Sequence, residues 1–270
     1  MRKLLRVTPF LCCVGCTVVL GFFWRGTAQP GPQVTQRPKK PAQIEWEQRL
    51  AELPVVDFTE FDATDSTDPR RAAKNRRHNL GLNTDGTRPP RLDDQEAGGF
   101  SLPITHTPAE PAFPVTSDVI VIGTIREAKA YLSEDRTEVY SEVSLSIEEI
   151  LKAAPQYGLK IGGTVSGDRR GGAVRFPSGK ILRVGNWGRR IPSTGHRYLL
   201  FLRDMGDGGF TIVTGYQLTG KGVLPLDGVE GSDESVFKNY ERLRNTSDAS
   251  LLDAVRKAIN ETGSGVGGVR

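Results

Sequence analysis

Residues 138–148 read EVYSEVSLSIE, and their strict alternation decides the fold class. Neighbouring side chains of a strand point to opposite faces of a sheet, so the two halves of this pattern separate in space. The apolar half consists of Val139, Val143, Leu145 and Ile147, and the other half of Tyr140, Glu142, Ser144, Ser146 and Glu148. The stretch therefore predicts a long strand with one buried face and one face in water, as antiparallel sheets have.

Shorter strands are predicted on both sides of it. Residues 119–122 form an apolar run typical of a buried strand, and Gly123 allows a bend or bulge after it. Further strands are predicted at 164–166, 173–176, 180–184, 198–202 and 210–214. The turn Pro177-Ser178-Gly179 joins two of these into a hairpin. Short strands with frequent turns indicate a mainly β fold, a small antiparallel barrel or sandwich, over residues 115–228.

The chain after this domain changes character. Residues 250–259 predict an amphipathic helix, because Leu251, Leu252, Val255 and Ile259 form one apolar stripe. The helix belongs to a C-terminal helical region over residues 229–262, and a flexible tail over residues 263–270 follows it.

The first 28 residues have the composition of an export signal. Residues 1–6 are basic, residues 7–24 are uncharged and mostly apolar, and Gly26-Thr27-Ala28 offers a cleavage site after Ala28. The run is long for a signal peptide and short for a full span, so an uncleaved anchor over residues 7–24 is an open alternative. A lipid on Cys16 is a third and weaker one, because the apolar run continues past it. In each case the chain is expected outside the cytoplasm: periplasmic, in the cell envelope or secreted.

Residues 29–114 contain 12 of the 17 prolines and little periodic hydrophobicity. Such a composition predicts a largely disordered segment, because it buries too little apolar surface to offset the entropy of ordering. One helix is expected within it, near residues 43–53. A basic cluster at residues 70–77 is interpreted as a solvated charge run, with contact to an anionic surface as the alternative.

The charge balance gives no argument for nucleic acid as a partner, and the predicted export argues against one. The whole chain has 36 basic and 32 acidic residues, but four of the basic ones lie in the leader, which has no acid. The remainder is therefore neutral, and a basic isoelectric point carries no message about nucleic acid. All three cysteines also lie in the leader, so neither disulfides nor thiol chemistry are expected elsewhere.

Charge is nevertheless distributed unevenly along the predicted barrel. Residues 160–203 contain ten basic residues and a single acid, Asp168, whereas residues 133–149 contain six acids and one base. The candidate anionic-ligand residues are Arg169, Arg170, Arg175, Lys180, Arg183, Trp187, Arg189 and Arg190. An anionic envelope polymer or an acidic protein surface would suit them. The alternative is that the basic and acidic segments are neighbouring strands that neutralise each other.

Motifs for catalysis and cofactors fail on their context. The stretch Gly215 to Lys221 resembles a phosphate-binding loop, but it is one residue short and has Gly222 where a magnesium ligand must stand. The three histidines, His78, His106 and His196, are not at metal-ligand spacing. No catalytic residue, metal or cofactor is therefore predicted. A hydrolase whose carboxylates converge only in the fold is the alternative function.

Four stretches carry a resemblance to a recurrent exported bacterial domain of unknown function: residues 117–123, 148–152, 172–179 and 197–202. The domain resembles an OB-like barrel, also found in metalloprotease-inhibitor N-domains, and the likeness covers about residues 110–228. The usual helix between the third and fourth OB strands is not visible, and the hairpin around Pro177 takes its place. The inhibitor family's N-terminal cysteine is absent, so no inhibitory mechanism is implied. The expected function is non-enzymatic binding or scaffolding at the cell envelope, through a barrel with a basic surface.

Overall fold

The computed structural model describes residues 51–59, 68–82, 86–98, 113–184, 189–227, 243 and 246–264. The predicted signal peptide or anchor, most of the predicted helix at 43–53, Trp187 and most of the tail lie outside this range. None of the helices in the described ranges is long and apolar enough to cross a membrane.

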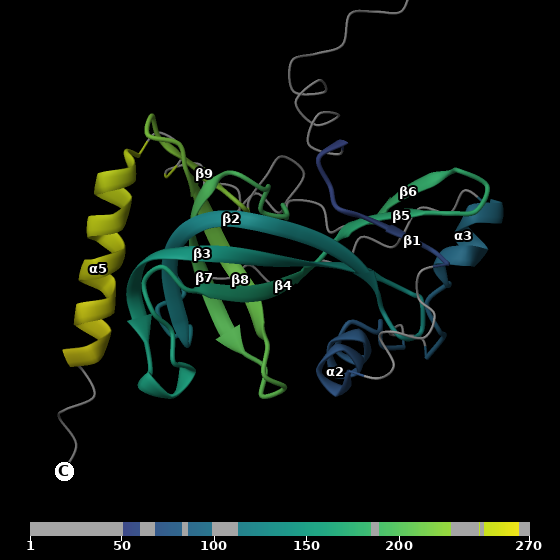
Figure 1. Ribbon diagram of the computed structural model, residues 1–270, viewed down its shortest axis with the longest axis horizontal. Coiled ribbons are helices and arrows are strands. Elements are labelled where there is room, and N and C mark those ends of the chain that lie inside the picture. The colour runs from purple at the N-terminus through teal and green to yellow at the C-terminus, as the bar shows by residue number, and fades with distance from the viewer. Residues whose placement is uncertain are drawn as a thin grey trace, which may run out of the picture. The chain divides into compact units, whose positions relative to one another are not determined.

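Five strands close into an antiparallel barrel (Figure 1). They are β2 (Val119–Leu132), β3 (Val139–Ala153), β4 (Thr164–Arg170), β7 (Arg197–Asp204) and β8 (Phe210–Leu218). Their order is β4-β3-β2-β7-β8, and β8 also pairs with β4 to complete the circle. This is the strand order of an OB barrel, so the predicted fold class is confirmed. A short strand, β9 (Val223–Pro225), continues the sheet beyond β8, and a single 3-10 turn, η1 (Pro155–Tyr157), follows β3.

The closure between β4 and β8 is the one parallel seam of the barrel in the described residues. It pairs Gly167 with Phe210 and Asp168 with Thr211, and the Thr211 hydroxyl donates to the Asp168 carbonyl oxygen at 3.2 Å. The seam is therefore short, and Asp168 lies on it.

The predicted hairpin stands between β4 and β7, where OB barrels usually carry a helix. It consists of β5 (Gly172–Arg175) and β6 (Ile181–Val184). A third strand, β1 (Val55–Asp57), pairs with β5 in parallel, so that a small second sheet of order β1-β5-β6 forms beside the barrel (Figure 1).

The alternation of residues 138–148 has the predicted consequence. Val143, Leu145 and Ile147 lie in the barrel interior with at most 2% exposure. Tyr140 and Glu138 are exceptions, because both stand at positions of the polar half and are nevertheless buried. Gly123 coincides with a shift of register against β3, as predicted, and a side chain there would overlap the Ser146 carbonyl oxygen.

The continuous apolar runs of β2 and β7 have two partners. One set of their side chains fills the barrel, and the other set packs beneath helix α5 (Asp248–Ser264). Leu251, Leu252 and Val255 of α5 are buried against the outer face of the sheet. The predicted amphipathic helix is thus confirmed, with ends that extend beyond residues 250–259.

The expectation that residues 29–114 are largely disordered is wrong for their described parts. These contain β1 and two helices, α2 (Pro69–Arg77) and α3 (Leu92–Gly98). A few apolar residues anchor these parts: Val56 and Leu92 are buried in a small third core with side chains of β2, β5 and β6. Helix α2 is ordered differently, through charge.

Candidate functional site

The structure places Arg169 in the interior and not on an exposed binding surface. Arg169 is 3% exposed, pairs with Asp227 and donates to the Arg190 carbonyl oxygen at 3.1 Å. Arg189 approaches the same carboxylate, with 3.8 Å between its Nε and the Asp227 Oδ1 atom, and Thr214 donates to the other oxygen. These groups form an internal polar network that fastens β9 and its neighbours to the barrel, which corrects the prediction for Arg169.

Two further candidates lie on the β5–β6 hairpin and contact the N-terminal segment. Arg175 donates to Asp57 at 3.3 Å, and Lys180 donates to the Glu96 carbonyl oxygen at 2.9 Å. The remaining described candidates, Arg170, Arg183 and Arg190, also interact with other groups of the chain. The structure thus gives most of the predicted basic residues roles inside the molecule.

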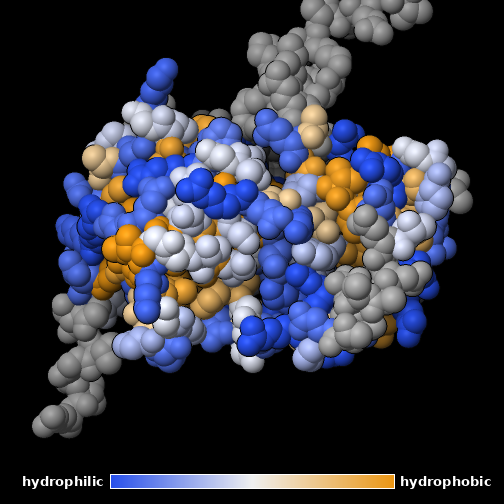
Figure 2. Space-filling model, viewed as in Figure 1, coloured by the Kyte–Doolittle hydropathy of each residue, from blue (hydrophilic) through white to orange (hydrophobic). Residues whose placement is uncertain are grey.

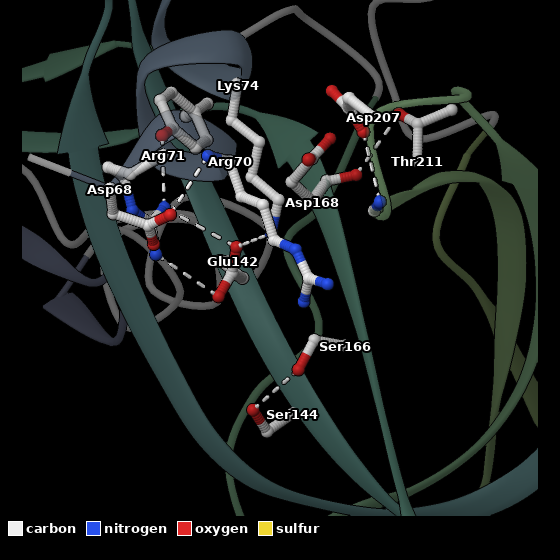
Figure 3. A network of polar contacts seen from close by, with 12 residues as sticks. Asp68, Arg70, Arg71, Lys74, Glu142, Ser144, Ser166, Asp168, Asp207 and Thr211 are labelled. Carbon is white, nitrogen blue, oxygen red and sulfur yellow. Dashed lines mark hydrogen bonds and ion pairs between the residues drawn. The ribbon is translucent and has the colours of Figure 1, made fainter.

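A different set of charges converges on the barrel. Glu142 on β3, Asp168 on β4 and Asp207 in the β7–β8 loop lie under helix α2 (Figure 3). Arg71 and Lys74 both pair with Glu142. Arg77 pairs with Asp168 and with Asp207 at the same time, and the His78 Nε2 atom lies 3.2 Å from Asp168. We call Glu142, Asp168 and Asp207 the acidic face.

Two stacked tyrosines complete this face. Tyr131 and Tyr140 are register partners on β2 and β3, with ring centroids 5.5 Å apart. The Arg71 guanidinium lies 3.6 Å above the Tyr131 ring, and the His78 ring stacks on Tyr140 at 4.1 Å. A guanidinium over an aromatic ring is attracted by the ring quadrupole, so the tyrosines favour cations as the carboxylates do.

The electrostatic environment favours the charged state of Arg71. The Tyr140 hydroxyl donates to Asn75 at 2.6 Å and accepts from Arg71 at 3.1 Å. Burial alone would lower the pKa of Arg71, but its contacts with Tyr140 and Glu142 outweigh burial and raise it. Burial raises the pKa of Tyr140, so its hydroxyl stays protonated. Asp168 is fully buried, and its charge is balanced by Arg77.

The loops on either side of the acidic face also contact α2 and the residues after it. In the β2–β3 turn, the Glu134 amide donates to the Asn75 carbonyl oxygen, and the Asp135 amide donates to the Asn79 side chain, each at 3.1 Å. In the β7–β8 loop, Asp207 holds Arg77. In OB barrels in general, the ligand-binding surface consists of the second and third barrel strands, which are β3 and β4 here, and of the loops that correspond to these two. In this chain α2 occupies that surface.

The surface around α2 is mostly hydrophilic (Figure 2). Apart from Asn75, its helical residues are exposed or half-buried, and none of them is a large apolar side chain. Polar contacts therefore dominate the docking of α2, in contrast to the apolar packing of α5.

Comparison with known proteins finds no family model and no curated protein that matches this chain. The assignment of a function therefore depends on the geometry of the acidic face. In the described ranges no three acidic, histidine or cysteine side chains gather in a way that could hold a metal ion.

The sequence contains two signals for this site. Asp68 and Pro69 precede the basic cluster, and an aspartate at the N-cap with proline at the first position is a helix start. The structure shows this cap, with the Asp68 side chain accepting from the Arg70 amide at 2.9 Å. Asp168 is the single acid in a basic segment, and it becomes the buried centre of the site.

Glu138, at the edge of the β2–β3 turn, gives the molecule a pH-dependent stability. Burial raises its pKa from 4.5 to about 7, with Asp135 adding to the effect and Arg170 opposing it. A carboxyl whose folded pKa is raised binds more protons in the folded than in the unfolded state between these two pH values. We expect stability to fall as pH rises from about 4.5 to about 7, by about 3 kcal/mol at most.

The Glu138→Gln variant should remove this slope and be more stable than the natural chain at pH 8. Urea unfolding at pH 5 and pH 8 measures both effects. Glu148→Gln is the control, because the pKa of this exposed carboxyl is lowered: its own desolvation is outweighed by bonds from Thr124 and Arg197. The contribution of Glu148 to the pH dependence has the opposite sign, because the stability that its ionised form provides is lost as pH falls. A Glu138→Gln chain with an unchanged slope would show that another group titrates.

Proposed function

We propose that this chain is a non-catalytic binding module that takes a cationic ligand on the acidic face of its barrel. The predicted leader supports a place outside the cytoplasm, in or near the cell envelope. The proposal keeps the expected class of function, binding or scaffolding through an OB-like barrel, and changes the charge of the surface that carries it from basic to acidic.

One observation carries the proposal: the acidic face is neutralised by an element from outside the barrel. In the described part of the chain, the lysine and arginine side chains that pair with Glu142, Asp168 and Asp207 belong to α2. Without α2, the barrel and its β7–β8 loop would leave three carboxylates and two tyrosine rings on the surface that OB barrels use for ligands. The chemical complement of such a surface is a group of arginine or lysine side chains.

The hydrolase alternative lacks comparable support. A glycosidase needs one carboxyl that donates a proton and another that acts as base or nucleophile. The carboxylates that converge in this structure already contact guanidinium, ammonium or imidazole groups, and Asp168 is fully buried. Ion pairing at these positions favours binding of a cation over proton transfer.

Binding of a nine-residue oligoarginine peptide to the purified full-length chain tests the proposal. Fluorescence anisotropy should show binding that weakens steeply with salt, because the contacts are between opposite charges. The double variant Glu142→Gln/Asp207→Asn should bind about tenfold more weakly or worse, since each lost charge-assisted bond contributes more than a neutral one. Asp168 is left intact because its burial makes it part of the fold.

The matched control is Glu148→Gln/Glu149→Gln, which removes the same charge from carboxylates that pair with Arg197 and Arg256 elsewhere. This control should bind oligoarginine like the natural chain. Heparin serves as the polyanionic counterpart. Binding of heparin without binding of oligoarginine would overturn the proposal and favour the basic residues of the β5–β6 hairpin.

A further inference from the structure

Four contacts that helix α2 and its C-cap residue make with the barrel follow a helical spacing, and Arg77 adds its pairs with Asp168 and Asp207 beside them. Arg71, Lys74, Asn75 and His78 stand at positions i, i+3, i+4 and i+7, which lie on one face of a helix. All four contact the acidic face or its tyrosines. Arg76 is exposed, whereas Arg70, although exposed, has its side chain beside Gly208 in the β7–β8 loop.

Three positions of the stripe meet groups that suit the shape of their side chains. Arg71 has a carboxylate on one side and a ring beneath it, which a flat guanidinium can satisfy together. Asn75 accepts a bond from the Tyr140 hydroxyl, and His78 offers a flat ring to the same tyrosine. The surface thus matches a helical pattern of side chains and not positive charge alone.

Helix α2 is attached to the barrel weakly enough that another helix can displace it from the acidic face. Its nine residues are too few for a stable helix in isolation, so its helicity depends on docking. It buries no large apolar side chain, whereas α5 buries Leu251, Leu252 and Val255. Undocking of α2 exposes ion-pairing groups to water, which solvates them, and leaves the apolar barrel core covered.

We propose that the acidic face is a receptor for a basic helix of a partner protein, and that α2 is an internal competitor which this helix displaces. The inference rests on the proposed function of the acidic face and adds the form of the ligand and its regulation. Because α2 is tethered, it acts at an effective concentration in the millimolar range. The apparent affinity for the partner is therefore reduced by the fraction of chains whose face is open.

A synthetic peptide with the sequence of residues 68–80 is the probe, and a scrambled peptide of the same composition is its control. The double variant Arg71→Gln/Lys74→Gln, made in the full-length chain, weakens the docking of α2 and leaves the acidic face unchanged. It should bind the probe at least about tenfold more tightly than the natural chain. Arg76→Gln/Lys257→Gln removes the same charge from exposed positions of α2 and α5 and should change nothing.

The natural chain provides a second measurement that needs no variant. With saturating probe, hydrogen exchange at the amides of α2 should accelerate, while the amides of β2 and β3 keep their protection. Unchanged exchange in α2 while the probe is bound would overturn displacement, because the two helices would then use different surfaces.

The outcomes separate the inference from the proposed function. If oligoarginine binds as expected but the scrambled peptide equals the probe, the helical ligand is wrong and the cationic site stands. If the probe binds the natural chain and Arg71→Gln/Lys74→Gln with equal affinity, α2 does not compete for the acidic face, and that part of the inference is wrong. If neither oligoarginine nor the probe binds any of the chains, the proposed function itself falls. If light scattering shows that the double variant forms dimers, the helix that the acidic face binds belongs to a second copy of this chain and not to a partner protein.

Discussion

Replacement of Val143 by aspartate should lower the free energy of unfolding by about 4 kcal/mol or more. Val143 is 1% exposed and lies in the barrel interior with Leu145 and Val165. A carboxyl group at this position has neither water nor a polar partner in the described interior cluster, so it must be buried unpaired or force the strand out of place. Since domains of this size are stable by about 5–15 kcal/mol, much of the population could unfold.

Chemical denaturation followed by circular dichroism measures this loss. Ser146→Asp is the matched control, because it introduces the same group into the same strand on a face that is only half-buried. It should cost less than about 1 kcal/mol. Equal losses for the two variants would mean that β3 is paired one residue out of register, since a shift by one exchanges its faces.

The second large effect is expected from Asp168→Asn, with a loss of about 3 kcal/mol. The asparagine keeps the shape of the side chain and removes its charge, so Arg77 and His78 lose the buried anion between them. Removal of one partner from a buried ion pair is costly because the other charge stays behind without its counterion. Arg77 retains Asp207, which keeps the loss at the lower end of the usual range.

Asp253→Asn is the control for this prediction, because Asp253 is 79% exposed and its pair with Arg256 is a surface one. Its cost should stay below about 0.5 kcal/mol. In an Arg77→Gln background, Asp168→Asn should lower the free energy of unfolding far less than in the natural chain, because the guanidinium that would be left without a counterion has already been removed. A loss that is independent of residue 77 would contradict the ion-pair explanation.

The strands of the barrel could be predicted because their signals are local. The alternation of residues 138–148 and the run at 119–122 record, residue by residue, which faces of β3 and β2 are buried. The hairpin turn around Pro177 determines its own register. The parallel pairing of β4 with β8 leaves no such trace, because it depends on how distant strands meet.

The candidate site could not be predicted for the same reason. Basic residues at 70–77 have the same composition whether they lie in water or against a carboxylate, and only the folded barrel brings Glu142, Asp168 and Asp207 beneath them. The burial of Tyr140 was likewise hidden, since α2 and not the sheet covers it. A sequence shows which residues are charged, but not which of them form ion pairs in the folded protein.

The position of Asp168 on the seam has a consequence for the order of folding. Helix α2 precedes every barrel strand in the chain, yet Arg77 needs carboxylates from both sides of the closure, Asp168 on β4 and Asp207 just before β8. Distant strands pair late because a long loop must close first. The acidic face is therefore expected to form only at the last step of folding, and a partly folded chain would not yet present it.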